Sequence, residues 1–256
     1  MNTGMRFSDT ARRKPSWTIE RGKQMAQSST IEWTEATWNP WHGCHKVSPG
    51  CAHCYMYRDK KRYGQDPSIV VRSKTSFDAP RRWKSPKMIF TCSWSDFFVS
   101  EADEWRREAW QVIRDTPQHT YQILTKRPER ILEHLPDGWP LHNVWLGVSV
   151  ENPRFYWRIE SLNQIPASVR FLSLEPMLSS MAGLPLEGIS WVVVGGESGP
   201  RCRPMKAEWV REIQRQCRKA KAAFFFKQWG GPRKDVTGRI LDGKTWNAMP
   251  VPLLTA

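Results

Sequence analysis

From residue 88 onward the chain alternates short apolar runs with amphipathic stretches, and this alternation limits the possible folds more than any other feature. The apolar runs are rich in β-branched and aromatic residues and cover 88–93, 121–125, 144–150, 170–175, 190–196 and 223–228. Between them, apolar residues recur every three or four positions in 102–115, 128–135, 155–165 and 208–220. Strands that alternate with helices predict an α/β protein with a largely parallel sheet.

A further strand is expected within residues 31–41, ahead of three closely spaced cysteines. The count then predicts a partial or complete (β/α) barrel of about six to seven parallel strands, with the cysteine loop after the first strand. Functional groups of such barrels gather at the carboxyl ends of the strands. Polar residues close the apolar runs and are expected on that rim: Ser93, Asp96, Lys126, Ser149, Glu151, Glu175, Glu197, Lys227 and Gln228.

Three of the six cysteines, Cys44, Cys51 and Cys54, lie on one loop with the spacing C-x6-C-x2-C. The chain is long enough for a core without disulfides, so the cluster favours a metal site. Three thiolates can hold three irons of a 4Fe–4S cluster and leave the fourth iron open, which suits a loop beside a polar rim. Structural zinc takes four ligands, and the fourth would come from His42, His45 or His53.

A three-cysteine loop after the first strand of an α/β barrel resembles the radical S-adenosylmethionine superfamily. The usual spacing there is C-x3-C-x2-C, so the first gap is three residues longer here. The segments TEATWNPWHGCHKVSPGCAHCY, FTCSWSDFF, LTKRPER, WLGVSVEN, FLSLEPML and VVVGGESG resemble, more closely, a phage-associated family of uncharacterised proteins, a divergent relative near the spore photoproduct lyase branch. This resemblance covers residues 29–232 and implies a barrel domain there, with a 4Fe–4S cluster and S-adenosylmethionine as cofactors.

The resemblance also implies roles for single residues. Cys44, Cys51 and Cys54 would ligate the cluster, and His53 and Tyr55 would pack near the adenine of the cofactor. Polar residues at the ends of the next strands would hold the rest of the cofactor. The amino group would meet Ser93 and Asp96, the carboxylate Lys126, and the ribose Ser149 and Glu151.

Three further residues are expected on the substrate side as candidate catalytic groups. Glu175 and Glu197 follow the later strands, and Cys202 lies in the loop after the GGE motif, where a thiol could return a hydrogen atom. A GGE motif that follows the second strand binds the cofactor in this superfamily, but here it closes the sixth, so that role is not transferred. Cys92 and Cys217 are expected to be packing residues.

Charge and aromatic content favour a polyanionic partner. The chain has 39 Lys and Arg against 25 Asp and Glu, a formal net charge of +14, and 15 tryptophans. Cations neutralise phosphates and aromatic faces stack on bases, so we expect a nucleic-acid substrate, DNA in particular. The candidate contacts are the basic stretches 71–84 and 202–206 and the tryptophans near the cysteine loop or strand ends, namely Trp33, Trp38, Trp41, Trp83, Trp94 and Trp229.

The ends of the chain contribute the remaining expectations. Residues 1–28 are basic and lack the apolar core of a secretory signal, so we expect a flexible arm and a cytoplasmic protein. No apolar run approaches the roughly 20 residues of a membrane helix, which predicts no membrane association. Residues 233–256 are expected to form a coil with a hairpin around 235–244.

The leading hypothesis is an enzyme that generates a 5′-deoxyadenosyl radical for DNA repair or base modification. Its electrons would come from a partner such as a flavodoxin or ferredoxin. A zinc-stabilised, non-catalytic nucleic-acid-binding protein and a radical enzyme acting on a small molecule or peptide are the alternatives.

Overall fold

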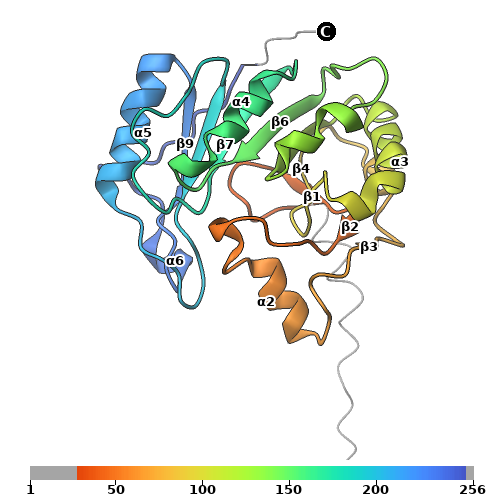
Figure 1. Ribbon diagram of the computed structural model, residues 1–256, viewed down its shortest axis with the longest axis horizontal. Coiled ribbons are helices and arrows are strands. Elements are labelled where there is room, and N and C mark those ends of the chain that lie inside the picture. The colour runs from red at the N-terminus through yellow and green to blue at the C-terminus, as the bar shows by residue number, and fades with distance from the viewer. Residues whose placement is uncertain (1–27, 252–256) are drawn as a thin grey trace, which may run out of the picture.

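The computed structural model describes residues 28–251 and contains a curled sheet of seven parallel strands. The strands follow one another in chain order, so the sheet is a half-barrel with β1 and β9 as its two edges (Figure 1). The prediction of an α/β fold with a partial or complete barrel of about six to seven parallel strands is thus confirmed, and the barrel is partial. Its strands are β1 (Ala36–Trp38), β4 (Met88–Thr91), β5 (Thr120–Thr125), β6 (Val144–Ser149), β7 (Val169–Leu174), β8 (Trp191–Gly195) and β9 (Ala223–Gln228).

Helices α3 (Asp103–Arg114), α4 (Trp157–Asn163) and α5 (Ala207–Ala220) flank the sheet where amphipathic stretches were predicted. In α5, the buried residues Val210, Ile213 and Cys217 recur at intervals of three and four, which places them on one side of the helix. The stretch 128–135 instead forms two short 3-10 helices, η4 (Pro128–Arg130) and η5 (Leu132–His134). Within residues 28–251, every helix is too short or too polar to span a bilayer.

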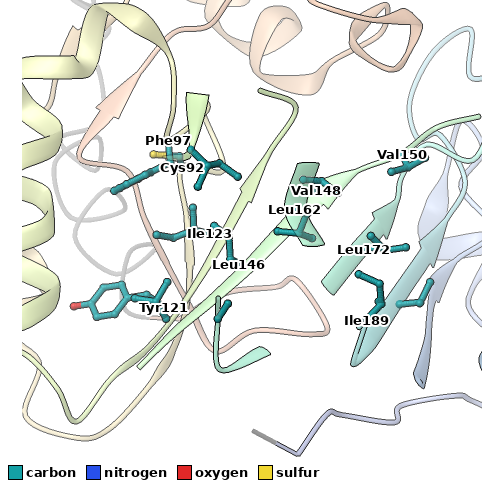
Figure 2. Close-up of a cluster of buried hydrophobic side chains, with 14 of the residues drawn as sticks. Cys92, Phe97, Tyr121, Ile123, Leu146, Val148, Val150, Leu162, Leu172 and Ile189 are labelled. Carbon is teal, nitrogen blue, oxygen red and sulfur yellow. The ribbon is translucent and has the colours of Figure 1, made fainter. Parts of the chain in front are cut away.

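The outer face of the sheet packs a large apolar cluster against the helices. Figure 2 shows Tyr121 and Ile123 of β5 and Leu146 and Val148 of β6 pointing into this cluster, with Leu162 of α4 opposite them. Side chains alternate between the two faces of a strand, so the residues between these belong to the inner face. The two faces therefore carry different sets of side chains.

The inner face holds a smaller cluster that is mostly aromatic, and we call it the inner aromatic cluster. Gly147 lies on this face because a Cβ there would come within 2.5 Å of the Phe171 ring. The next inward positions toward the carboxyl ends, Ser149 and Ser173, are polar. The members of the cluster are Trp33, Trp145, Val169, Phe171, Trp191, Val193 and Phe225.

Most of the tryptophans expected near the site are core residues. Trp33, Trp38, Trp41 and Trp83 are all at most 5% exposed, so the prediction that they form a stacking platform is wrong. The indole N–H of Trp38 donates to the Phe77 carbonyl over 2.9 Å and that of Trp41 to the Asp96 carbonyl over 3.1 Å. For these two buried indoles, loops 39 and 55 residues away in the sequence supply the acceptor.

The segment between β1 and β4 carries the cysteine loop. Strand β2 (Trp41–His42) pairs antiparallel with β3 (Val71–Arg72), and η1 (Pro49–Cys51) and α2 (Tyr55–Arg62) lie between them. Figure 1 shows α2 apart from the layer of α3, α4 and α5. A separate short helix η2 (Ala79–Arg82) follows β3, and η3 (Ser100–Ala102) precedes α3.

The region after β9 differs in part from the predicted hairpin. Residues Lys234–Thr237 form the short helix α6, and only the bridge between Leu241 and Lys244 has the antiparallel pairing of a hairpin among the described residues of this region. The hairpin prediction is wrong for 235–237, which are helical, and the Thr237 hydroxyl bonds back to the carbonyls of Gly230 and Lys234. The predicted arm 1–28 lies outside the described residues except for its last position, as do 252–256.

Candidate functional site

The cysteine loop leaves β2 through a turn that requires glycine. Gly43 has φ 103°, and a Cβ at this position would lie 2.2 Å from the Ile69 carbonyl oxygen. The next residue, Cys44, is held by a hydrogen bond of 3.0 Å from its N–H to the Pro67 carbonyl. The loop ends at Cys54, after which α2 begins.

All six cysteines of the chain fall within residues 28–251, and each is a free thiol. Cys44, Cys51 and Cys54 are half-buried, while Cys92 and Cys217 are buried in the core as expected. Burial raises the pKa of Cys44 to about 12, the Asp96 carboxylate adds to this rise, and Arg127 opposes it. Cys44 is therefore a protonated thiol in the absence of a ligand that displaces its proton.

Arg127 joins Cys44 to the end of β5. Its Nη1 lies 3.6 Å from the Cys44 sulfur, and its Nη2 donates to the His45 carbonyl over 3.0 Å. The same Nη1 pairs with the Asp96 carboxylate at 3.1 Å. One guanidinium thus contacts the cysteine loop and the rim of the sheet together.

Asp96 is buried, and its carboxylate oxygens accept hydrogen bonds from neighbouring groups of the protein. The Thr125 hydroxyl donates to it over 2.6 Å, and the backbone N–H groups of Phe98 and Lys126 donate over 2.9 Å each. With Arg127, this gives the carboxylate four donors. Asp96 therefore positions the ends of β4 and β5 rather than facing open space.

A second carboxylate, Glu197, ties the cysteine loop to the loop after β8. It accepts from His53 Nδ1 over 3.0 Å and from the Arg203 backbone N–H over 2.9 Å. The Arg203 guanidinium pairs with Glu197 and also donates to the Pro49 carbonyl over 3.0 Å. Burial alone raises the pKa of Glu197, but the hydrogen bonds from Arg203 and His53 outweigh burial and lower it to about 2.

Glu151 forms a third link and is wholly buried. It pairs with Arg158 of α4 at 3.0 Å, and Arg158 also donates to the Ser149 carbonyl over 2.8 Å. The other oxygen of Glu151 accepts from the Gly50 N–H over 3.4 Å. The carboxyl end of β6 is thereby connected to the middle of the cysteine loop.

The carboxyl ends of β7 to β9 carry an ion pair at the edge of the inner face. Glu175 lies 3.1 Å from Lys227 and accepts from the Ser173 hydroxyl over 3.2 Å. Gly195 makes room for this carboxylate, because a Cβ there would come within 2.3 Å of Glu175 Oε1. We call Ser149, Ser173, Glu175 and Lys227 the polar layer, because they lie closer to the carboxyl ends of the strands than the inner aromatic cluster does.

Tyr55 and Ser93 approach the polar layer from the cysteine side. The Tyr55 hydroxyl donates to the Ser93 carbonyl, and the Ser93 hydroxyl accepts from the Asn39 amide over 3.0 Å. Burial of its hydroxyl raises the pKa of Tyr55, and the neighbouring Cys54 and Glu175 raise it further. Tyr55 is thus close to both the cysteine loop and the polar layer.

The remaining predicted residues lie at the rim. Lys126 is half-buried directly after β5, and no carboxylate of residues 28–251 forms an ion pair with it. Cys202 is half-buried in the loop between β8 and α5, where its N–H donates to the Gly199 carbonyl over 3.2 Å. The contacts of these side chains with a cofactor stay predictions.

The thiols of Cys44, Cys51 and Cys54 suit an iron–sulfur cluster in kind and number, but they do not form a metal-binding group in this structure. Within residues 28–251, no three His, Cys, Asp or Glu side chains form a group that could hold a metal ion. Two of the three histidines considered for zinc are engaged, because His45 pairs with Glu101 and His53 with Glu197. His42 differs, since its Nδ1 is buried without a hydrogen-bond partner.

Sequence reasoning missed the roles of three arginines at the site, although Arg203 lies in the stretch 202–206 that is expected to contact nucleic acid. Arg127 follows the predicted rim residue Lys126, Arg158 lies on the apolar side of α4, and Arg203 follows Cys202. Only Arg158 left a usable signal, because an arginine beside Ile159 and Leu162 at helical spacing predicts a buried charge that needs a partner.

Two of the five basic residues in the stretch 71–84 form ion pairs within the protein. Arg72 makes two bonds of 2.6 Å to Glu108, and Arg81 pairs with Asp78 and Asp115. In 202–206, Arg203 pairs with Glu197. These arginines support the fold, so the net positive charge available to a partner has to come from other residues.

Comparisons with known proteins place the chain in a family without assigning a role to it. The model of the family described as "Protein of unknown function (DUF5131)" matches residues 28–250. Neither the curated proteins nor the solved structures gave a match.

Proposed function

This chain belongs to the DUF5131 family, and we propose that it is an iron–sulfur enzyme of the radical S-adenosylmethionine type that acts on nucleic acid. One observation carries the proposal. A loop with three free thiols follows the first strand of a parallel half-barrel and is bonded to the carboxyl ends of β5, β6 and β8. These ends are where enzymes of this architecture keep their reacting groups.

Cys44, Cys51 and Cys54 are the residues that would hold a 4Fe–4S cluster. The chemistry that such a cluster supplies is the one-electron reduction of S-adenosylmethionine, which yields a 5′-deoxyadenosyl radical. Arg127 beside Cys44 offsets the negative charge of thiolates, and Ser48 lies 3.9 Å from the Cys51 sulfur. Cluster binding requires the three thiols to move together.

The polar layer and its neighbours supply groups for a bound cofactor. Lys126 suits the carboxylate of its amino-acid end, and the hydroxyls of Ser93 and Ser149 suit polar groups of that end and of the ribose. Tyr55 and His53 lie on the cysteine side, where the adenine would pack. Asp96 and Glu151 act by positioning Arg127 and Gly50.

Glu175, Glu197 and Cys202 remain the candidate groups on the substrate side. Glu175 has Lys227 within 3.1 Å, so the pair can exchange a proton with a substrate without leaving an isolated buried charge. The partners we propose are DNA as the substrate and a flavodoxin or ferredoxin as the source of electrons. The formal net charge of +14 supports a polyanionic substrate.

Anaerobic reconstitution with iron and sulfide tests the proposal. The wild-type protein should bind about four irons per chain and turn brown, as should Cys217→Ala, which removes a core thiol outside the loop. Cys44→Ala, Cys51→Ala and Cys54→Ala should each lose the colour. With dithionite and S-adenosylmethionine, the loaded protein should release 5′-deoxyadenosine; a colourless protein that holds no iron would overturn the assignment.

The orphaned Nδ1 of His42 favours a second candidate, a zinc-stabilised nucleic-acid-binding protein. In that case the protein purified from cells should contain one zinc per chain. The single variants His42→Ala and Cys51→Ala should each lose this zinc. Metal analysis of the same preparations separates the two candidates, because only the first predicts that His42→Ala leaves iron binding intact.

A further inference from the structure

A hollow of about 420 Å³ lies beside the cysteine loop, and none of the roles described above uses it. Pro49 of the cysteine loop, residues 152–155 after β6 and residues 178–179 after β7 line it. Its volume falls in the range of roughly 300–1,000 Å³ that is typical of ligand sites. We propose that the hollow binds one nucleotide of a single-stranded nucleic acid, adjacent to the nucleotide that reacts; this inference rests on the proposed function.

The walls of the hollow match a nucleobase in chemistry. Pro49, Phe155 and Leu178 provide apolar surface, and Asn152 and Ser179 provide polar groups. The Phe155 ring is backed by the buried Arg158, whose guanidinium lies 4.1 Å from the ring centroid. A ring fixed in this way offers a stacking face, and every base has a flat face to stack on it.

Arg154 supplies the cation for the phosphate. It is exposed at the hollow, and no carboxylate in residues 28–251 pairs with it. The two carboxylates that link these loops to the cysteine loop are already neutralised, because Glu151 pairs with Arg158 and Glu197 with Arg203. The charge of Arg154 is therefore free to contact a phosphate.

The hollow is also in direct connection with the cysteine loop. Pro49 forms one wall, and its carbonyl accepts from Arg203, while the next residue, Gly50, donates to Glu151. A nucleotide held here would contact Pro49, which lies on the same loop as the three thiols. The Asp or Glu side chains of a peptide could pair with Arg154 but have no ring to stack on Phe155.

Fluorescence anisotropy of a short labelled oligothymidylate, measured over a series of salt concentrations with the full chain, tests this site. Arg154→Gln should weaken binding and reduce the slope of log K against log salt by about 0.7, the value for one phosphate contact to a single strand. Phe155→Leu keeps the apolar bulk and removes the ring, so it should weaken binding roughly 5- to 150-fold with an unchanged slope. Arg215→Gln, an exposed arginine of α5 paired with Glu212, is the matched control and should have no effect.

The inference would be overturned if the wild type did not bind the oligonucleotide at low salt, or if Arg154→Gln and Arg215→Gln weakened binding equally. It would also be overturned if Phe155→Leu bound the oligonucleotide with unchanged affinity while its thermal midpoint equalled that of the wild type. Competition by polyglutamate as effective as competition by unlabelled oligonucleotide would overturn it as well. Iron content and 5′-deoxyadenosine release, measured on the same preparations, keep the two proposals apart. A loaded protein that releases 5′-deoxyadenosine but does not bind the oligonucleotide overturns this site and the nucleic-acid substrate, and leaves the radical-generating enzyme standing. A protein that binds DNA through Arg154 and Phe155 but takes up no iron overturns the enzyme alone.

Discussion

Asp96 and Arg127 form an almost fully buried ion pair beside Cys44, with side chains that are 7% and 9% exposed. Neither charge is solvated by water, so each depends on the other and on the backbone donors around Asp96. Removing one partner leaves an uncompensated buried charge, whereas removing both does not.

We predict that Arg127→Met lowers the free energy of unfolding by about 3–5 kcal/mol in urea denaturation, because it strands the Asp96 carboxylate. The double variant Asp96→Asn with Arg127→Met should recover part of that loss. Arg233→Met, which breaks the exposed pair with Asp235, is the control and should cost about 0–1 kcal/mol. Equal losses in the two single arginine variants would contradict the prediction.

Gly195 permits a close approach of the Glu175 carboxylate to β8. We predict that Gly195→Ala destabilises the protein by about 1–3 kcal/mol, because the new Cβ would lie 2.3 Å from Glu175 Oε1. The same substitution in a Glu175→Ala background should cost less, since the clashing oxygen is gone. A cost that is identical in both backgrounds, measured by thermal denaturation, would exclude Glu175 as the cause.

Among the elements, the loop after β8 and the cysteine loop are linked through one carboxylate. Glu197 holds Arg203 from its own loop and His53 from the other, and Arg203 reaches Pro49. The folded pKa of Glu197, about 2, is below the ordinary value of 4.5, so the ionised form stabilises the fold. This stability is fully present above pH 4.5 and is lost as the pH falls toward 2.

We predict that Glu197→Gln is less stable than wild type by roughly 3 kcal/mol near pH 6 and that the difference shrinks as the pH approaches 2. Unfolding free energies measured between pH 6 and 2 check this expectation. Glu212→Gln, at an exposed pair on α5, should show a small difference at every pH. A constant gap between wild type and Glu197→Gln would mean that the link does not depend on the charge.

The positions of the strands could be predicted from the sequence because each buried parallel strand is a continuous apolar run of about the right length. The stretch 128–135 could not be predicted in detail, since its apolar spacing fits a helix whether or not the hydrogen bonds follow the α pattern. The contacts of Arg127 and Arg203 with the cysteine loop join residues 82 and 154 positions apart, and a local sequence pattern carries no information on such contacts.

In the whole molecule, many of the aromatic side chains pack inside the half-barrel. A half-barrel has a concave face that must be filled, and large rings fill it with few side chains. The sequence alone groups Trp33 with the tryptophans near the cysteine loop or strand ends, which are expected to contact a nucleic acid. The structure instead places its ring 4.7 Å from Phe90 and 5.8 Å from Trp191, inside the sheet.

Trp191 lies at the centre of the inner aromatic cluster, where its ring contacts those of Trp33, Trp145, Phe171 and Phe225 at centroid distances of 5.6–6.0 Å. Its indole N–H also donates to the Ala248 carbonyl over 2.9 Å, which connects the last described segment to the concave face. The side chain is fully buried, so its removal leaves a cavity that the surrounding rings can close only in part.

We therefore predict that Trp191→Ala lowers the free energy of unfolding by about 3–5 kcal/mol, measured by urea denaturation. Trp191→Phe should retain part of the packing but lose the hydrogen bond to Ala248, and its loss should be intermediate. Trp157→Ala is the matched control, because this tryptophan of α4 is 41% exposed and should cost less than half as much. If both alanine variants were equally stable, the concave face would not depend on the rings that fill it, and the half-barrel would owe its stability to the outer layer alone.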